Sequence, residues 1–351
     1  MAEREGRKLD HIRLCTAEDT GPITYPPDRS TLLHCVEIMP DSFPLAAPEA
    51  VDTATTFLGR KVSAPLFVSA MTGGPARAGT LNRSLARACQ KMSLPLSLGS
   101  GRPMLRDEAG AETFDVRVEA PDVPILANIG IAQASREPAE ALAWIVERTH
   151  ADGLAIHLNF AMEAIQPEGD RDPGPVAETL ARLREKLSFP LVVKEVGCGF
   201  SREQLRLLAS TGVDWIDVAG AGGTSWVRIE GLRGSIEDRR LASTFSRWGF
   251  PTAACLGWAR EIGLGNVLAS GGIRTGLDAA RALAMGAKLC GMALPVIRAL
   301  SSGGEEGLER FLERVIRELR LAVHLSGRRS TSEMGTVPYV VLDPLKSWLE
   351  R

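Results

Sequence analysis

The sequence predicts a (β/α)8 barrel, the fold also called a TIM barrel, and three observations indicate it. Eight short apolar runs recur between residues 64 and 293, and each ends in or near Gly, Ser, Thr or Asn. The runs are almost continuously hydrophobic, as expected for parallel strands that are buried on both faces. Helix-like stretches lie between most of them, so strand and helix alternate along the chain, which is typical of this barrel.

The predicted strands are, in order, 64–71, 94–100, 123–130, 153–159, 190–197, 215–220, 266–272 and 288–293. The helix-like stretches between them include GTLNRSLARACQKM, AEALAWIVERTHA, VAETLARLREKL, SREQLRLLASTG and TGLDAARALAMG. A doubly wound sheet is the alternative. Such a sheet usually has a GxGxxG turn after its first strand, and AMTGGPARAG does not fit that pattern.

Three segments remain outside this alternation. PTAACLG (251–257) resembles a ninth strand, and we place it in a long insertion between strands six and seven. HCVEIMP (34–40) suggests a β-hairpin, and residues 305–325 suggest a closing helix. We therefore predict an N-terminal extension, residues 1–60, that folds over the mouth of a barrel made by residues 61–351.

Composition excludes several classes of protein. The chain has 351 residues, of which 44% are hydrophobic and 24% charged, and its net charge is −2. No global basic field recruits nucleic acid or an anionic membrane. No apolar run approaches the ~20 residues of a membrane span, and the first residues lack the apolar region of a signal peptide. The six scattered cysteines form no CxxC pair, so we predict reduced thiols in a cytoplasmic protein.

The active site of such a barrel lies at the C-terminal ends of its strands. ASGGIRTG (269–276), followed by CGMA, is the strongest local pattern, because glycine-rich turns after strands seven and eight often hold a phosphate. GAGGTSW (220–226) supplies a second such turn, although glycines in both turns could serve only tight connections. Lys194 ends the run PLVVK, and a buried, unpaired lysine needs an anionic partner such as the N1/C2 carbonyl edge of a flavin.

RKLDHIRL (7–14) contains a second basic cluster, formed by Arg7, Lys8, His11 and Arg13. By itself the cluster is a solvated charged face. If the segment folds over the barrel mouth and meets Arg102 and His157, these cations make a pocket for a diphosphate.

These motifs together resemble the type 2, FMN-dependent isopentenyl diphosphate isomerases. The resemblance runs in order through RKLDHI, TTFLGR, APLFVSAMTGG, LANIG, HLN, QPEGDRD, KEVGCG, DVAGAGGTSW, ASGGIRTGLDAARALAMGA and GMALP, and covers most of the chain. It implies a TIM barrel that binds FMN and Mg²⁺, forms a tetramer or octamer, and interconverts isopentenyl and dimethylallyl diphosphates. Reduced FMN is the active form, and no second nucleotide site is evident, so the reductant is external.

The resemblance also implies roles for single residues. Those expected to contact FMN are Ala70, Met71, Thr72, Ser100, Asn128, Lys194, Thr224, Ser225, Gly271, Gly272, Arg274, Met292 and Ala293. Those expected to hold the substrate diphosphate are Arg7, Lys8, His11, Arg102, His157 and Asn159. Glu163 would ligate Mg²⁺, and His157, Met162 and Glu163 would lie where the chemistry occurs.

The chain departs from the family pattern at three positions. The family motif HLNxxQE reads HLNFAME here, so Met162 replaces the glutamine expected beside the substrate alkene. Gly101 replaces the glutamine of GSQR, and Pro173 replaces an aromatic residue. Methionine offers only a weak thioether acceptor in place of an amide.

Several readings of these departures stay open. The change at Met162 can leave a slower isomerase or an inactive flavin protein. Alternatively, a larger and more apolar pocket can suit a longer prenyl diphosphate, with protonation leading to cyclisation. An FMN-dependent oxidoreductase is a further alternative, but its histidine base would follow strand six, where only His324 is available.

Overall fold

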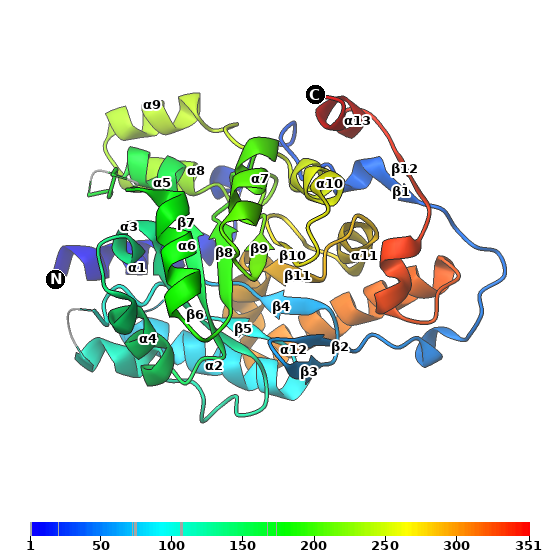
Figure 1. Cartoon of the computed structure of the whole chain (residues 1–351), viewed down its shortest axis with the longest axis horizontal. Helices are drawn as coiled ribbons and strands as arrows, with labels where there is room; N and C mark the ends of the chain where they lie inside the picture. Colours follow the sequence, from blue (N-terminus) through cyan, green and yellow to red (C-terminus); the bar gives the residue numbers. More distant parts are fainter. Residues whose placement is uncertain are drawn as a thin grey trace.

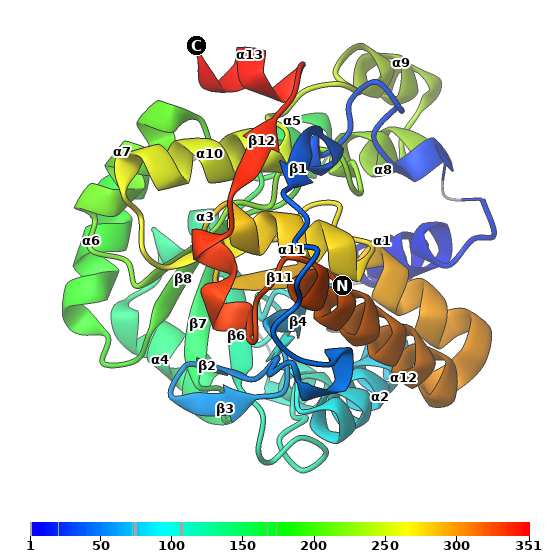
Figure 2. The same ribbon diagram turned by 90° about the vertical axis from the view of Figure 1, so that its right-hand side faces the viewer.

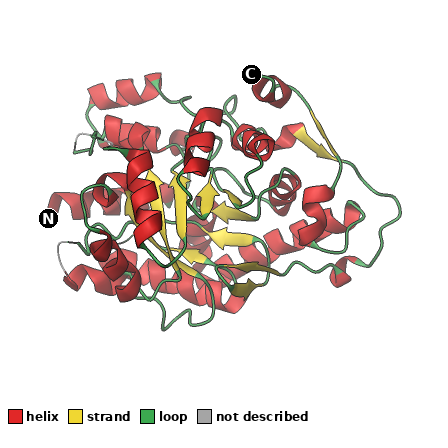
Figure 3. Cartoon of the chain, in the orientation of Figure 1, coloured by secondary structure: helices red, strands yellow, loops and turns green. Residues whose placement is uncertain are grey.

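The structure is a computed structural model that describes residues 2–19, 21–71, 73, 76–105, 108–166, 168–172 and 174–351. Eight parallel strands close into a barrel and helices surround it, which confirms the predicted fold class (Figures 1 and 3). The barrel strands are β4 (Leu66–Val68), β5 (Leu96–Ser97), β6 (Ile125–Gly130), β7 (Gly153–Leu158), β8 (Leu191–Glu195), β9 (Trp215–Asp217), β10 (Val267–Ala269) and β11 (Leu289–Met292). Each lies within one of the eight predicted runs.

Helices follow the strands, and they include one at each of the five helix-like stretches quoted above. They are α2 (Ala76–Met92), α3 (Ile131–Ala134), α4 (Ala139–Arg148), α5 (Phe160–Ile165), α6 (Val176–Lys186), α7 (Arg202–Ser210), α8 (Trp226–Arg233), α9 (Ile236–Thr244), α10 (Thr252–Ile262), α11 (Gly276–Ala284) and α12 (Leu294–Leu325). Several begin at residues that suit a helix start. Ser201 and Gln204 form a capping box at α7, and Thr275 and Asp278 form one at α11, so each pair satisfies two otherwise free backbone groups.

An apolar layer fills the half of the barrel that lies toward the N-terminal ends of its strands. It consists of Phe67, Leu126, Ala155, Val192, Leu268 and Leu289, one from each of six strands, with Trp215 packed against them. Phe57 joins this cluster from outside the barrel and meets the Trp215 ring edge-on, with 5.1 Å between ring centroids. The N-terminal end of the barrel is therefore filled by these side chains.

Phe57 belongs to a hairpin that was not predicted from the sequence. β2 (Thr55–Phe57) pairs antiparallel with β3 (Arg60–Val62) through a two-residue turn at Leu58 and Gly59, both with positive φ. Such turns are usually Asn-Gly or Asp-Gly, which is why Leu-Gly gave no signal.

The predicted hairpin at residues 34–40 is wrong. β1 (Val36–Ile38) pairs antiparallel with β12 (Tyr339–Val341), far away in the sequence, and the two strands lie side by side in Figure 2. A single short strand carries no information about a partner so distant. After β12, α13 (Leu345–Leu349) ends the ordered elements.

Residues 251–257 lie outside the barrel, as predicted, but they form a helix. Pro251 starts α10, whose first turns are rich in alanine, a strong helix former, and whose inner face is buried. The predicted closing helix is the second part of α12, which is interrupted at Gly304. No helix in the described parts of the chain has the length and apolarity needed to cross a bilayer.

Candidate active site at the barrel mouth

A polar layer lies directly above the apolar layer, at the C-terminal end of the barrel. Each residue of this layer lies two positions after a residue of the apolar layer or after Trp215. Because side chains alternate along a strand, it points into the barrel as that residue does. The residues of the polar layer are Ser69, Asn128, His157, Lys194, Asp217 and Ser270. The strand register places His157 beside Lys194, and Lys194 beside Asp217. These side chains therefore form one neighbouring set inside the barrel.

His157 is held as a neutral imidazole within this set. Its Nδ1 lies 2.7 Å from Oδ1 of Asn128, and since that oxygen can only accept, Nδ1 donates and Nε2 is left as an acceptor. Desolvation, together with the nearby Lys194, Lys8 and Arg102, lowers the pKa of His157 to about 3. Gly130 leaves the room that the ring needs, because a Cβ there would lie 3.0 Å from Nε2.

Lys194 is not unpaired, which corrects the expectation from sequence. Its Nζ donates to the backbone carbonyl of Glu195 at 2.6 Å. Burial lowers the pKa of Lys194, while the charges of Asp217 and Glu195 act in the opposite direction. The lysine thus has two acidic neighbours as well as its carbonyl acceptor, and any ligand above it is an additional partner.

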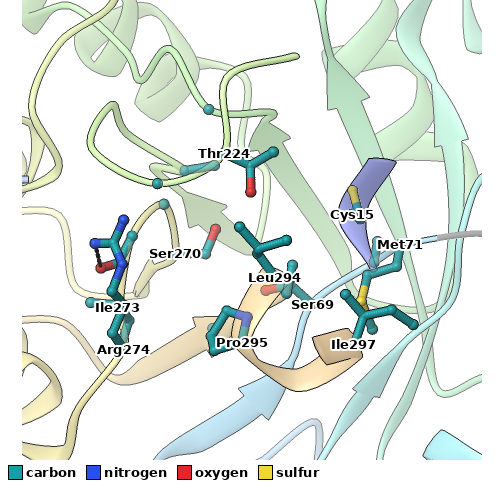
Figure 4. A pocket seen from close by; sticks show the side chains of 18 of the residues that line it. Cys15, Ser69, Met71, Thr224, Ser270, Ile273, Arg274, Leu294, Pro295 and Ile297 are labelled. Carbon is teal, nitrogen blue, oxygen red and sulfur yellow. Dashed lines mark hydrogen bonds between the residues drawn. The ribbon is translucent and has the colours of Figure 1, made fainter. Parts of the chain in front are cut away.

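A cavity of about 470 Å³ opens above this polar layer. The residues predicted for the cofactor that line it are Ala70, Met71, Lys194, Thr224, Gly271, Gly272, Arg274 and Ala293. Figure 4 shows Ser270 and Thr224 on the same side as Arg274, with Cys15, Met71 and Ile297 grouped on the opposite side. The cavity therefore has a polar, glycine-rich side and an apolar side.

Four predicted cofactor residues are not among the lining residues of this cavity. Met292 packs with its side chain in the helix layer, and the hydroxyl of Ser225 accepts the Arg228 N–H as the N-cap of α8. Asn128 holds His157, as described above, and Ser100 is half-buried after β5. Thr72 lies outside the described residues, as does Pro173.

Arg274 holds the two glycine turns together. Its guanidinium donates to the carbonyl of Gly222 at 2.8 Å and to that of Gly272 at 3.0 Å. Gly271 and Gly272 have φ of +90° and +91°, and a Cβ on Gly271 would lie 2.2 Å from the carbonyl oxygen of Gly220. These turns need glycine both for backbone conformation and for close approach.

A strap, residues 22–31, packs on these turns and was not foreseen. Tyr25 donates its N–H to the Gly223 carbonyl at 3.0 Å, and Ser225 donates its N–H to the Ile23 carbonyl at 2.8 Å. Thr24 forms an isolated bridge with Thr224, which lines the cavity. The extension thus supports the site from outside the barrel.

α1 (Ala2–Cys15) contributes to the wall of the cavity. His11, Ile12 and Cys15 line it, and Lys8 donates to the Gly73 carbonyl. Desolvation and the charges of Arg7 and Arg102 lower the pKa of Lys8 to about 7. Among the described residues, Lys8 forms no salt bridge with a carboxylate that would offset the charges of Arg7 and Arg102 acting on it.

His11 has a different environment from the other predicted diphosphate ligands. Its Nε2 lies 2.7 Å from Oε1 of the buried Glu230, and its ring meets that of Trp226 edge-on. Burial lowers the pKa of His11, and hydrogen bonding to Glu230 opposes the shift. The main interaction of His11 therefore ties α1 to α8.

Asn159, Met162 and Glu163 form a local cluster at the start of α5. Asn159 Nδ2 donates to Glu163 Oε1 at 2.8 Å and lies 3.8 Å from the Met162 sulfur, while the Asp170 N–H donates to Glu163 Oε2 at 2.7 Å. Within the residues the structure describes, no group of three His, Cys, Asp or Glu side chains could hold a metal ion. Glu163 can thus supply one protein ligand, and substrate or water must supply the others.

Gly101 does not open the pocket as predicted. A Cβ at this position would lie 3.2 Å from Cγ2 of Ile145, 3.3 Å from the carbonyl oxygen of Asn128 and 3.4 Å from the sulfur of Met104. The space in that direction is already filled by packed atoms, so the missing side chain leaves no void there.

Two polar residues of the layer, Ser69 and Asp217, were missed from sequence. The Ser69 hydroxyl is buried, lines the cavity and has no hydrogen-bond partner. Asp217 accepts from both the hydroxyl and the N–H of Ser270. Counting two residues on from each apolar interior side chain would have found both.

Comparison with known proteins identifies the family. The model of the FMN-dependent dehydrogenase family matches residues 131–339. The isopentenyl-diphosphate delta-isomerase of Methanothrix thermoacetophila is 39% identical over 350 residues, with 98% of this chain and 95% of the relative covered. That of Methanoregula boonei is 41% identical over 339 residues, with 93% and 91% covered. The chain belongs to the type 2 isopentenyl-diphosphate delta-isomerase family. Its enzyme class is therefore that of an isomerase.

Solved structures show the same fold at low sequence identity. A flavocytochrome b2 variant superposes with a TM-score of 0.69 at 20% identity, covering 97% of this chain and 84% of the other. The site itself fits the flavin that the family model names. A buried hydroxyl without a partner and a buried lysine lie at the floor, and turns that only glycine can form lie at the side. His324, the candidate base of an oxidoreductase, bonds to the Ala46 carbonyl and does not line the cavity.

Proposed function

We propose that the protein isomerises isopentenyl diphosphate to dimethylallyl diphosphate with FMN and Mg²⁺. The observation that carries this proposal is the desolvated ammonium of Lys8 near His157, on which the charges of Arg7 and Arg102 act unfavourably. Like charges held together in a desolvated cleft cost free energy, and a polyanion relieves that cost. A diphosphate carries the charge and the multiple acceptors that such a cluster requires.

The cofactor assignment rests on the two sides of the cavity. Lys194, Ser69 and Thr224 offer polar groups to the ring system, and the turns at Gly271 and Gly272 offer a close approach to a phosphate. Reduced FMN, when bound, would supply a proton to the alkene and accept one in return, with no net transfer of electrons. The Ser100 and Ala293 contacts, and those of Thr72 and Met292, remain part of the proposed set.

The chain's own residues prepare the site for an alkene. Protonating an unactivated alkene gives a tertiary cation, which water would capture, so the pocket must be dry. Ile12, Cys15 and Trp226 line the cavity from α1 and α8, and Met71 and Ile297 lie on the same side as Cys15. Neutral His157 and Asn159 offer hydrogen-bonding groups without adding charge.

Mg²⁺ would use Glu163 as its one protein carboxylate. Each of its oxygens already accepts one hydrogen bond and keeps further lone pairs for a cation. Mg²⁺ commonly takes one or two carboxylates and completes its octahedron with substrate phosphates and water. Glu163 lies beside Asn159, a proposed diphosphate ligand, which supports a bridging ion.

The remaining parts of the proposal concern the setting of the enzyme. We place it in the cytoplasm as a homo-oligomer, a tetramer or an octamer, with an external source of electrons for its flavin. A net charge of −2 argues against nucleic acid as a partner.

The test of this function uses hydrogen exchange. Protein loaded with reduced FMN and Mg²⁺ is incubated in D₂O with isopentenyl diphosphate and, in parallel, with C10, C15 and C20 prenyl diphosphates. Deuterium should enter the C5 compounds, and chelation of Mg²⁺ should stop it. A cyclic isomer formed only from a longer substrate would instead establish the alternative, a prenyl diphosphate cyclase.

Met162 is the observation that supports the alternative function, a prenyl diphosphate cyclase. It is half-buried beside Asn159, where the family has glutamine. Met162→Gln should raise kcat for C5 isomerisation at least about tenfold, because an amide can relay a proton and a thioether cannot. Met162→Leu keeps the volume without an amide and should give no gain. Equal rates for both variants in single-turnover assays would show that Met162 does not limit the reaction.

A further inference from the structure

Asp217 is the one acidic side chain of the polar layer. It lies on β9, and the strand register pairs it with Lys194 on β8, so both side chains point into the barrel. Asp217 is 1% exposed and Lys194 is 8% exposed. A buried ion of either sign is costly unless a counter-charge accompanies it.

The hydrogen bonds of Asp217 are those of a carboxylate. The N–H groups of Ser270 and Ala219 lie 3.0 and 3.3 Å from Oδ1, and N–H groups can only donate. The Ser270 hydroxyl lies 2.8 and 2.9 Å from the two carboxylate oxygens. Burial raises the pKa of Asp217, and the charge of Lys194 and these hydrogen bonds act in the opposite direction. Three donors converge on one carboxyl group, which stabilises its ionised form.

Asp217 and Lys194 do not touch. Lys194 forms no direct salt bridge within the described residues, and its ammonium donates to the Glu195 carbonyl instead. The carboxylate therefore acts on the lysine through space, across a barrel interior in which charges are weakly screened. Substituting the carboxylate by an amide of the same shape removes this field and breaks no bond to the lysine.

The other charged groups around Lys194 are few. His157 on β7 is neutral, and Glu195, next in sequence on β8, is held by the N–H groups of Val196, Cys198 and Gly199 on the other face of the sheet. Burial raises the pKa of Glu195 to about 7. Glu195 therefore gains its charge as pH rises through neutrality, whereas the three donors on Asp217 favour the ionised form of that carboxyl group.

We propose that Asp217 is a positioning residue that keeps Lys194 in its ammonium form beneath the flavin. The inference rests on the proposed cofactor site, and it adds Asp217 as the residue that maintains the positive charge of Lys194 at the base of that site. A lysine that lost its proton would keep two N–H groups but lose the positive charge that strengthens their hydrogen bond to the carbonyl edge of the ring. Asp217 thus acts on cofactor binding without touching the cofactor.

The test measures the dissociation constant of FMN between pH 6 and pH 9 by quenching of flavin fluorescence. In Asp217→Asn, the pH at which FMN affinity declines should fall by about one unit, so at a pH above both midpoints binding is up to about tenfold weaker than in the parent. Binding weakens as pH rises because the neutral amine has no charge and is a weaker donor than the ammonium. Ser270→Ala removes a hydrogen bond to Asp217 but keeps its charge, and should keep the parental midpoint.

A double-mutant cycle with Lys194→Met separates this role from a structural one. Without the lysine, Asp217→Asn should have no further effect on the pH profile. The proposal would be overturned if Asp217→Asn caused the same loss of FMN affinity with and without Lys194. It would also be overturned if the substitution weakened FMN binding equally at every pH and left the midpoint of the pH profile unchanged. Circular dichroism and melting temperatures check that each variant is folded. A parent protein that binds no flavin at any pH would overturn the proposed function as well.

Discussion

Replacing Lys8 with methionine should lower kcat/KM for isopentenyl diphosphate about 100-fold, because a charge-assisted hydrogen bond to the substrate contributes about 3 kcal/mol. The same substitution should raise the melting temperature of the substrate-free protein at pH 6. There it removes an ammonium that is desolvated and repelled by Arg7 and Arg102. Steady-state kinetics and thermal unfolding measure the two effects.

Arg13→Met is the matched control on the same helix. Arg13 is 75% exposed and pairs with Asp10 on the surface, so its loss removes one positive charge without touching the mouth. Activity and stability should then change little. A Lys8→Met protein with unchanged kcat/KM would show that the cation cluster does not bind substrate.

The same prediction extends to pH. The pKa of Lys8 is about 7 in the folded protein and 10.5 in the unfolded chain. Below pH 7 Lys8 is protonated in both the folded and the unfolded state, and the folded protein carries the full cost of the desolvated ammonium. Between pH 7 and 10.5 Lys8 is protonated mainly in the unfolded chain, so the free energy of unfolding rises with pH. In contrast, kcat/KM, which reports the free enzyme, should fall above pH 7. Both trends should be absent in Lys8→Met.

Gly271→Ala should abolish FMN binding and lower the free energy of unfolding by more than about 4 kcal/mol. The new Cβ would lie 2.2 Å from the oxygen and 2.4 Å from the nitrogen of Gly220, so one of the two glycine turns must move. Denaturant unfolding and flavin titration measure the two losses.

Gly286→Ala is the control that separates the steric clash of an added Cβ from the strain of a positive φ. Gly286 also has a positive φ, +105°, but no heavy atom lies within 4 Å of an added Cβ. This variant should lose only about 1–2 kcal/mol and keep its flavin affinity. Equal losses in the two variants would mean that the close approach of the two turns has no special role.

The barrel was predictable from sequence because its signals are local. Each strand is a buried apolar run, and each following helix has its own amphipathic period, so no long-range information was needed. The failures involve partners that are distant in sequence. β1 could not be recognised as the partner of β12, and the hairpin at Leu58 and Gly59 lacked the usual turn residues.

The site was predictable to the extent that strand ends mark it. Lys194, His157 and the glycine turns lie where the strand-end rule placed them, and α1 brings Lys8 near Arg102. What the sequence could not reveal is how donors are shared. Arg274 donates to the loop carbonyls of Gly222 and Gly272, and His11 donates to Glu230. These acceptors are distant in sequence from His11 or belong to a neighbouring turn, so the sequence did not indicate them. Asp217 was hidden inside an apolar run.

The strap at residues 22–31 has a consequence for how the protein is made. Its acceptor Gly223 and the neighbouring turn at Gly272 are synthesised about two hundred residues later, and the strand Val36–Ile38 waits still longer for Tyr339–Val341. Contacts so distant along the chain form late and slowly. On the ribosome, the N-terminal segment must therefore remain undocked through most of translation, exposed to chaperones. Residues 22–38 are therefore made well before the residues that hold them in the folded protein.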